Sequence, residues 1–513
     1  MTLFEMLART AAAQGDAPAL RFRGQTMSYG ALAETAERFA GGLSALGVRK
    51  RDRVALLLPN SPQFAIAYLA ASRAGASLIP LNVLYRPDEA RYILADADAE
   101  VLITAEPFRP LVQALRPHLP HLKHVVMVSE GAAAVDEVAF RALCAQEPGK
   151  RVFVADNDVA VILYTSGTTG RPKGAMLTHY NLLANVASCV EVLHPRADDC
   201  FLSALPLFHA FAAMVFLLLP VRVGACTQLM ERFLPANCLQ LLVESRATVF
   251  GGVPSMIGLL LQISRETKPD LSALRLCVSG GAPLPPEIWL AFEEAYAVKM
   301  VEGYGLTEAS PVVAVNPPDG LRKPGSIGLP IPGVEVKILA EDGQVVGPEV
   351  IGELVVRGEN VMKGYLQRRA DTAQAIRGGW LHTGDLARMD ADGYLYIAGR
   401  KKELIIVGGL NVYPGEVERV LVEHPAVLEA AAFGVPDNAR GEAVWAAVTL
   451  RPSEHVSEKA LQAHCREKLA PYKVPRGIDI REELPKNALG KIVRHLLHEE
   501  VTSRLRQPVQ VET

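Results

Sequence analysis

The sequence predicts an α/β protein: a large N-terminal domain of stacked βαβ-type subdomains with a β-rich subdomain, followed by a small α+β C-terminal domain. Two observations predict this class. Over roughly the first 400 residues, helical patterns alternate with short β-branched runs, as in parallel sheets covered by helices. Glycine-rich turns become frequent after residue 320, and the texture changes again beyond Gly399. At 513 residues, the length is that of roughly three compact units.

The N-terminal half gives the clearest alternation of elements. Residues 32–46 are predicted as a helix that ends at Gly47, a residue type suited to a left-handed C-terminal position. A buried strand over 53–58 and a helix over 63–74 follow. Further strands are predicted at 76–79, 101–104 and 124–128. We expect the weakly patterned stretch 129–151 to be a surface connection.

The C-terminal part is richer in strands. Runs at 334–338 and 352–357 predict the β-rich subdomain that closes the large domain. We place the domain boundary before Arg400, giving domains 1–399 and 400–513. In the second domain, strands are predicted at 430–435 and 444–450 and a helix at 457–469.

Composition excludes several classes of protein. The net charge of −3 provides no global field that would favour nucleic acid or an anionic membrane. The seven cysteines form no CxxC pair and are interpreted as free thiols of a reducing compartment. The N-terminus has charges among its apolar residues, unlike a signal peptide, and the longest apolar stretch, 210–221, is too short for a membrane span. We therefore expect a cytoplasmic protein and leave peripheral membrane contact and a homodimer open.

The most informative segment is Tyr164-Thr-Ser-Gly-Thr-Thr-Gly-Arg-Pro-Lys-Gly174, which follows an apolar run. Small residues let backbone N–H groups approach an anion, hydroxyls add donors and a lysine adds positive charge. The segment is not a Walker A motif, because Lys173 is followed by glycine and not by serine or threonine. It predicts a phosphate-binding loop of another kind.

Further motifs follow in a fixed order: Pro206-Leu-Phe-His-Ala210, Ser279-Gly-Gly-Ala-Pro-Leu284, Gly303-Tyr-Gly-Leu-Thr-Glu308, His382-Thr-Gly-Asp385, Gly399-Arg-Lys-Lys-Glu403 with Gly408-Gly409, and Pro485-Lys-Asn-Ala-Leu-Gly-Lys491. With these motifs the chain resembles, over essentially its whole length, the acyl-adenylate-forming superfamily of acyl-CoA synthetases, peptide-synthetase adenylation domains and firefly-type luciferases. The resemblance implies an ATP- and Mg²⁺-dependent enzyme.

The resemblance implies a nucleotide site drawn from several motifs. Tyr304 would stack on adenine, Thr307 would reach the phosphates, Glu308 would hold Mg²⁺, and Asp385 with Arg400 would hold the ribose. The remaining implied nucleotide or CoA contacts are Thr165, Ser166, Gly167, Thr168, Thr169, Gly170, Lys173, Gly281, Ala282, Pro283, Glu302, Gly303, Gly305, Gly408 and Gly409.

The catalytic lysine is assigned to Lys491, with Lys486 as its rival. A carboxylate that attacks the α-phosphorus of ATP brings two anions together, and a positioned ammonium offsets their repulsion. The family pattern Pro-Lys-x-x-x-Gly-Lys points to Lys491. In the family, the small domain turns after this step to admit coenzyme A past a glycine-bearing strand, here Gly408-Gly409, and Lys402 occupies the hinge position.

The acyl site implied by the resemblance contains His209, Phe211, Val215, Gly280 and Pro311. A lone histidine in an apolar motif is more often a core residue, but at this family position it gates the acyl site, and His209 stands among both the catalytic and the acyl-binding candidates. No arginine accompanies these residues, which argues against diacids. The motifs are most similar to those of bacterial medium- and long-chain fatty acid–CoA ligases. An aryl or phenylpropanoid acid–CoA ligase, and a stand-alone ligase that loads a carrier protein, remain alternatives.

Overall fold

A computed structural model describes residues 1–131, 134–165, 171–437, 440–486 and 492–506. The chain forms two compact units. Unit 1 contains residues 1–336 and 355–382, and unit 2 contains residues 337–354 and 383–513. The α/β class, with a large N-terminal part and a smaller α+β C-terminal part, is confirmed.

Unit 1 contains an eight-stranded sheet in the order β19-β9-β8-β4-β3-β5-β6-β7. Its centre is parallel and fully buried, with β3 (Arg53–Leu57) between β4 (Ser77–Pro80) and β5 (Val101–Ala105), and with β6 (His124–Val128) beyond β5. Continuous apolar runs such as these are typical of parallel strands covered on both faces. The antiparallel hairpin of β8 (Val159–Thr165) and β9 (Lys173–Thr178) extends the sheet, and β19 (Gly364–Tyr365) pairs with β9.

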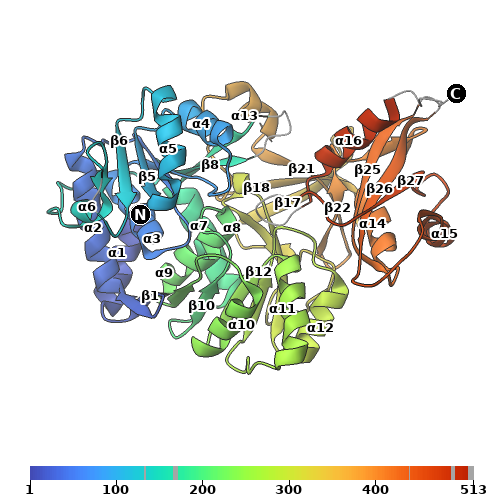
Figure 1. Ribbon diagram of the computed structural model, residues 1–513, viewed down its shortest axis with the longest axis horizontal. Helices are drawn as coiled ribbons and strands as arrows, with labels where there is room; N and C mark the ends of the chain where they lie inside the picture. The colour runs from blue at the N-terminus through green and yellow to red at the C-terminus, as the bar shows by residue number, and fades with distance from the viewer. Residues whose placement is uncertain (132–133, 166–170, 438–439, 487–491, 507–513) are drawn as a thin grey trace. The chain divides into compact units, whose positions relative to one another are not determined.

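Helices of unit 1 pack against this sheet as their apolar residues predict. The helix α2 (Tyr29–Ala45) begins at its N-cap Ser28, and Gly47 follows with the positive φ expected of its place. The helix α3 (Pro62–Ala74) is buried along most of its length, and α4 (Pro87–Asp96) packs into the core that contains Ile79, Leu102 and Ile162 of the sheet (Figure 1). The helices α2 and α3 and the strands β3 to β6 agree with the elements predicted from the sequence to within a few residues, whereas α4 was not predicted.

The stretch 129–151 was predicted as a surface connection, and that prediction is wrong for its second half. It contains β7 (Val138–Ala139), which pairs with β6, and α6 (Phe140–Cys144). Phe140 is buried against Phe39, with ring centroids 4.4 Å apart. The elements are so short that no periodic pattern could reveal them.

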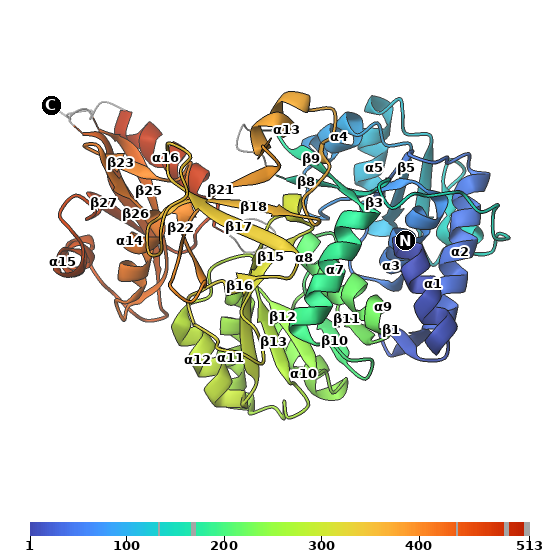
Figure 2. The ribbon, with the colours of Figure 1, turned by 180° about the vertical axis from the view of Figure 1, so that it is seen from behind.

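A second, nine-stranded sheet of unit 1 has the order β16-β15-β14-β13-β12-β10-β11-β1-β2. Its parallel centre consists of β10 (Cys200–Ser203), β11 (Cys226–Leu229), β12 (Val249–Gly252), β13 (Leu276–Ser279) and β14 (Lys299–Gly305). The helices α10 (Pro235–Glu244), α11 (Pro254–Thr267) and α12 (Pro286–Tyr296) lie beside these strands (Figure 2). Ligand sites in such sheets lie at the carboxyl ends of the strands.

The predicted β-rich part is a five-stranded sheet. Its strands follow the order β17 (Val334–Leu339), β18 (Gly352–Gly358), β21 (Trp380–Met389) and β20 (Ile376–Arg377), and β22 (Leu395–Arg400) pairs with β21.

Unit 2 contains a second small sheet with helices on both faces. The long antiparallel pair β25 (Val427–Asp437) and β26 (Gly441–Leu450) is flanked by β23 (Ile405–Val407) and β27 (Gly477–Arg481). Alternate residues of β25 face opposite cores: Ala430 and Ala432 face one, and Ala431 and Phe433 face the other. The first core includes α14 (Pro414–Val422) and α15 (Glu458–Lys468), and the second includes α16 (Arg494–Arg506).

Candidate active site

The phosphate-binding loop is predicted to follow a strand-like run, and its described ends lie on two strands that pair with each other. Thr165 is the last residue of β8 and pairs with Lys173, the first residue of β9. A Cβ atom at Gly174 would lie 2.8 Å from Ile162 and 3.1 Å from the Tyr164 ring, so any larger residue would have to displace these side chains. The loop candidates Ser166, Gly167, Thr168, Thr169 and Gly170 lie outside the described residues.

Asp96, at the end of α4, accepts hydrogen bonds that hold the start of this loop. The Tyr164 hydroxyl donates to Asp96 at 2.7 Å, and the Arg368 guanidinium donates to the other carboxylate oxygen at 2.7 Å. The Arg368 guanidinium also donates to the Tyr92 hydroxyl at 3.3 Å, and that hydroxyl donates to the Pro172 carbonyl at 3.1 Å. Asp96 thus binds one end of the loop directly and the other through Arg368 and Tyr92, and the sequence analysis did not single it out.

Lys173 is held by a second acidic residue that sequence analysis missed. Its ammonium forms an ion pair with Asp371 of α13 (Arg369–Ala375) and lies 5.5 Å from the centre of the Tyr365 ring. The lysine side chain is 15% exposed. A cation in this place is fixed and partly desolvated, which strengthens its attraction for a phosphate.

The motif Gly303-Tyr-Gly-Leu-Thr-Glu308 brings its acidic end to the loop. The strand β14 ends at Gly305, and the short helix η4 (Thr307–Ala309) carries Thr307 and Glu308. The Glu308 carboxylate accepts hydrogen bonds from the Tyr365 hydroxyl at 2.9 Å and from the Thr165 hydroxyl at 3.4 Å. Two predicted site residues from distant motifs, Thr165 and Glu308, therefore lie together, and Tyr365 is a third member that the sequence did not reveal.

A carboxylate set among hydroxyls is suited to Mg²⁺. Magnesium prefers oxygen ligands and is usually held by one or two carboxylates plus substrate phosphates. In the described part of the chain, no cluster of three or more His, Cys, Asp or Glu side chains could hold a metal by protein ligands alone. Glu308 therefore fits a magnesium ion that is shared with a nucleotide.

Gly305 is required for the turn that places Glu308. A Cβ atom there would lie 2.2 Å from the Pro311 carbonyl oxygen, which accepts a hydrogen bond from the Leu306 N–H at 3.0 Å. At Gly303 the nearest atom, the Ala314 carbonyl oxygen, is 3.4 Å away, an ordinary contact. The two glycines of the motif thus differ in how much space they have. Tyr304, between them, is half-buried and pairs with Ala314.

Glu302 is a buried carboxyl group that ties two predicted motifs together. It is 3% exposed, and one of its oxygens accepts from the Leu284 N–H at 3.0 Å. Its other oxygen and the hydroxyl of Ser279, opposite it on β13, have no partner among the described residues. Burial raises the pKa of Glu302 to about 8, so the carboxyl is mostly neutral at pH 7.

Through this bond Glu302 positions the loop that carries Gly280, Gly281, Ala282 and Pro283. The loop needs glycine at Gly281, where φ is +82°. Glu302 was predicted to contact the nucleotide, and the contact that the structure shows is to the backbone of this loop.

Of the acyl-site candidates, Phe211 and Gly280 are neighbours. A Cβ atom at Gly280 would lie 3.4 Å from the Phe211 ring, so the ring covers the space that the missing side chain leaves. Val215 is buried in η3 (Met214–Leu218), a π-helical turn, and His209 directly precedes α8 (Ala210–Ala213), with no capping hydrogen bond from its side chain. Burial lowers the pKa of His209 to about 4, so its imidazole is neutral at pH 7.

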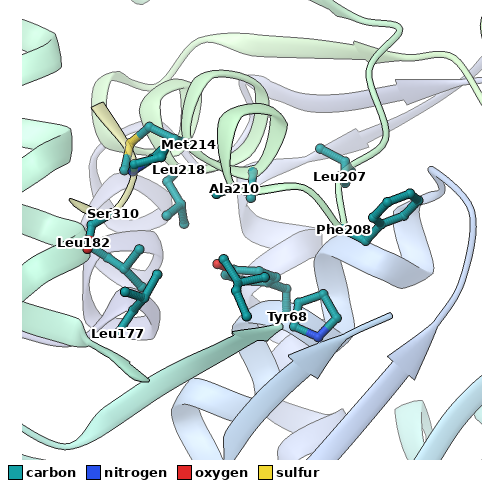
Figure 3. A pocket seen from close by; sticks show the side chains of 13 residues that line it. Tyr68, Leu177, Leu182, Leu207, Phe208, Ala210, Met214, Leu218 and Ser310 are labelled. Carbon is teal, nitrogen blue, oxygen red and sulfur yellow. The ribbon is translucent and has the colours of Figure 1, made fainter. Parts of the chain in front are cut away.

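A small apolar cavity adjoins this region (Figure 3). Tyr68 of α3, Leu182 of α7 (His179–Leu193) and Met214 of η3 point toward it. Its free space is about 10 Å³, roughly what a single water needs. Pro311 lines it, whereas the other described acyl-site candidates do not.

In unit 2, the two residues that were predicted to hold the ribose lie side by side. Asp385 of β21 and Arg400 of β22 are paired in register, and the guanidinium Nε lies 3.1 Å from the carboxylate. Asp385 is 6% exposed, and its backbone N–H donates to Thr383 at 3.0 Å. The carboxylate is therefore held rigidly by a neighbouring strand.

The glycine pair of unit 2 lies in a hairpin turn. Gly408 and Gly409, with φ of 60° and 83°, join β23 to β24 (Leu410–Val412), and two positive φ values are what a tight two-residue turn requires. Lys402 lies in an exposed turn after β22. Lys491, the catalytic candidate, lies outside the described residues, whereas its rival Lys486 forms an ion pair with Glu429 at 2.7 Å.

The fold and these sites define an adenylate-forming acid–thiol ligase. The family model described as AMP-binding enzyme matches residues 7–366, and that described as AMP-binding enzyme C-terminal domain matches residues 416–491. The chain belongs to the AMP-binding enzyme family. It is an acyl-CoA synthetase that uses ATP, Mg²⁺ and coenzyme A.

Three relatives illustrate the similarity. The long-chain-fatty-acid–CoA ligase of Bacillus subtilis is 38% identical over 98% of this chain and 95% of its own. The feruloyl-CoA synthase of an Amycolatopsis species is 37% identical over 93% of this chain and 94% of its own. The crystal structure of the anthranilate CoA ligase AuaEII with anthranoyl-AMP matches with a TM-score of 0.91 and 33% identity, covering 99% of this chain and 98% of that one.

No described helix is both long and apolar enough to cross a membrane.

The buried Glu302 makes stability depend on pH. Its pKa is near 4.5 when unfolded and about 8 when folded, so its favourable contribution is complete below pH 4.5 and is lost as the pH rises to 8. Glu302→Gln cannot ionise. The free energy of unfolding of the wild type relative to this variant should fall between pH 5 and 8 by up to ~1 kcal/mol per pH unit. Urea denaturation at four pH values measures this, and parallel pH profiles of the two proteins would contradict it.

The free space around Gly305 and Gly303 predicts that the two positions differ in their tolerance of an alanine. Gly305→Ala must displace the Pro311 carbonyl and should cost more than ~2 kcal/mol of stability. Gly303→Ala, the matched control, meets no atom closer than 3.4 Å and should cost less than ~1 kcal/mol. Thermal and urea unfolding compare the two. Equal destabilisation would show that the Pro311 contact does not limit this turn.

Proposed function

We propose that this acyl-CoA synthetase activates a medium- or long-chain fatty acid. The observation that carries the proposal is the apolar character of the acyl-site candidates Phe211, Val215 and Pro311, two of them buried, together with the identity to long-chain-fatty-acid–CoA ligases over nearly the whole chain. A hydrophobic pocket favours alkyl chains but discriminates among them by only about 1–3 kcal/mol per methylene.

The alternative acids are aromatic. The feruloyl-CoA synthase and the anthranilate CoA ligase are nearly as similar to this chain, and the ring of Phe211 over Gly280 could stack on an aryl acid. A third alternative keeps the adenylation step but passes the acyl group to a carrier protein.

We assign adenylation to residues 1–399 and the catalytic lysine to residues 400–513. The matches of one family model to residues 7–366 and of another to residues 416–491 support two functional parts. The hinge between them is assigned to Lys402, an exposed turn residue whose neighbours are already tied to Gly384 and Arg400.

In the proposed nucleotide site, the loop 166–170 and Lys173 hold the phosphates of ATP. To bind phosphate, the Lys173 ammonium must either donate to Asp371 and a phosphate oxygen at the same time or break its ion pair with Asp371. Its three N–H donors allow the first arrangement. Tyr304 would stack on adenine, bordered by Gly303, Gly305 and the loop 280–283, which Glu302 positions. Asp385 would accept hydrogen bonds from the ribose hydroxyls, with Arg400 beside it. Glu308 would hold Mg²⁺, which neutralises phosphate charge.

In the proposed first step, a substrate carboxylate oxygen attacks the α-phosphorus and pyrophosphate leaves. Lys491 would contact both the carboxylate and the α-phosphate, and Thr307 would donate to a phosphate oxygen. The alternative lysine is less suitable, because Lys486 is paired with both oxygens of Glu429 at 2.7 and 2.8 Å.

In the second step, the thiol sulfur of coenzyme A attacks the acyl carbonyl carbon and AMP leaves. The turn at Gly408-Gly409 presents backbone without side chains, which suits close passage of the narrow pantetheine arm. We place His209 at the acyl site and thiol entry as a neutral imidazole. Its depressed pKa makes it a weak proton acceptor, which favours a binding role over general-base catalysis.

We further propose that the enzyme works in the cytoplasm. The seven cysteines form no disulfide, as expected in a reducing compartment. A homodimer and peripheral contact with membranes that supply fatty acid are compatible with this assignment.

Pyrophosphate exchange and thioester formation test the proposed substrate. The purified enzyme is given fatty acids of increasing chain length, ferulate-like and benzoate-like acids, and a dicarboxylic acid, first with ATP and labelled pyrophosphate and then with coenzyme A. We expect the highest kcat/KM with a medium- or long-chain fatty acid. A preference for an aryl acid would establish the first alternative, and exchange without acyl-CoA formation would establish carrier loading.

The role of Lys491 predicts a separation of the two half-reactions. Lys491→Ala should lower pyrophosphate exchange by more than ~100-fold, since one charge stabilising a transition state is typically worth that much. It should still convert supplied acyl-AMP to acyl-CoA. Lys486→Ala is the control and should retain exchange, because that lysine is paired with Glu429. Equal loss of both half-reactions in Lys491→Ala would contradict the assignment.

The magnesium assignment predicts a specific change in metal response. Glu308→Gln keeps the size of the side chain and the ability to accept from Tyr365 but removes the negative charge. The Mg²⁺ concentration for half-maximal pyrophosphate exchange should rise at least ~10-fold, as expected for the loss of a carboxylate ligand. An unchanged Mg²⁺ dependence would remove Glu308 from the metal site.

A further inference from the structure

Two cysteines are neighbours at the amino-terminal ends of two adjacent strands of the nine-stranded sheet. The candidate active site lies at the opposite, carboxyl-terminal ends of the strands. Cys200 is the first residue of β10 and Cys226 the first residue of β11, and the two are direct partners in the parallel register. Adjacent strands lie about 4.8 Å apart. That spacing falls within the Cα separation of about 4.4–6.8 Å that a disulfide bond allows.

Both thiols line a hollow at this edge. It has a volume of about 650 Å³, and the loops before β10, β12 and β13 contribute to its wall, along with Arg21 and Arg246. The two cysteines are 7% and 5% exposed, and this small accessible surface faces the hollow. A small polar reagent can therefore approach the thiols without unfolding of the sheet.

The surroundings of the pair activate one of the two sulfurs. The adjacent Cys226 thiol and the Arg21 charge hold the pKa of Cys200 below its ordinary value. The adjacent Cys200 sulfur and burial raise the pKa of Cys226. The pair therefore ionises at Cys200, and the thiolate is the reactive form of cysteine.

Another pair of neighbouring cysteines lacks these features. Cys238 of α10 and Cys277 of β13 are both fully buried, and neither lines the hollow. Burial raises the pKa of each thiol. This inert pair is an internal control within the same fold.

We propose that Cys200 and Cys226 form a modification site at which peroxide converts the two thiols to a reversible disulfide. The Cys200 thiolate attacks one oxygen of hydrogen peroxide, the O–O bond breaks, and sulfenic acid and hydroxide form. The Cys226 sulfur then attacks the sulfenic sulfur and water leaves. The two cysteines lose two electrons in total, which peroxide accepts. The proposal rests on the strand register and the hollow and is independent of which acid the enzyme activates.

The test is thiol counting and peptide mapping of the intact enzyme. After brief exposure to low hydrogen peroxide, the native protein is unfolded in an alkylating reagent and digested under non-reducing conditions. The number of alkylated thiols should fall by two from the seven cysteines, a Cys200–Cys226 linked peptide should appear, and dithiothreitol should restore both thiols.

Variants distinguish this site from general oxidation. Cys200→Ser and Cys226→Ser should each abolish the linked peptide, while Cys277→Ser should leave it unchanged. Cys226→Ser should instead accumulate sulfenic acid at Cys200, detected with a dimedone probe. Three results in the wild type would each overturn the proposal. They are oxidation of other cysteines in place of these two, oxidation of Cys200 to sulfinic acid without the linkage, and no loss of thiols at all.

Discussion

The geometry of the phosphate-binding side of the active site depends on the carboxylate of Asp96. It accepts from Tyr164, which begins the loop, and from Arg368, while Tyr92 holds the far end of the loop at Pro172. These groups come from three separate parts of the chain, so one carboxylate joins α4, the β8–β9 hairpin and the segment after β19. Hydrogen bonds to a charged group are the stronger kind, and a loop fixed at both ends loses less entropy when it closes on an anion.

The charged side chains of the same region have partners within the protein. Asp371 compensates Lys173, Arg368 compensates Asp96, and two hydroxyls donate to one oxygen of Glu308. An unpaired charge in a partly buried site would be costly, so the pairs hold the functional groups in place at low cost. In the proposed mechanism, ATP and Mg²⁺ then exchange partners with groups that are already oriented, which is how preorganised sites stabilise developing charge.

The sequence predicted much of this arrangement, but it did so unevenly. Long elements such as β3 and α3 have clear apolar patterns and were located to within a few residues, and the order of motifs placed Thr165 and Glu308 in one site. The short elements β7 and α6 gave no pattern.

Asp96, Tyr365 and Asp371 were missed for another reason. Each acts across a large separation in sequence, 68 residues from Asp96 to Tyr164 and 198 from Lys173 to Asp371. A lone carboxylate at a helix end, as at Asp96, resembles any solvated charge until the fold brings its partners to it.

The described residues on both sides of the segment 487–491 are fixed by ion pairs and a β-bridge. Five residues before Lys491, Lys486 is paired with Glu429 of β25, and directly after Lys491, Ile492 forms a β-bridge back to Lys486. Arg494, two residues further on, donates to both oxygens of Glu418 at 2.9 and 2.8 Å and reaches Glu403 at 3.1 Å. These contacts lie within unit 2 and fix both flanks of the segment to its sheet and to α14. In the proposed mechanism, motion of the small domain as a body would deliver or withdraw Lys491, as the alternation between adenylation and thioester formation requires.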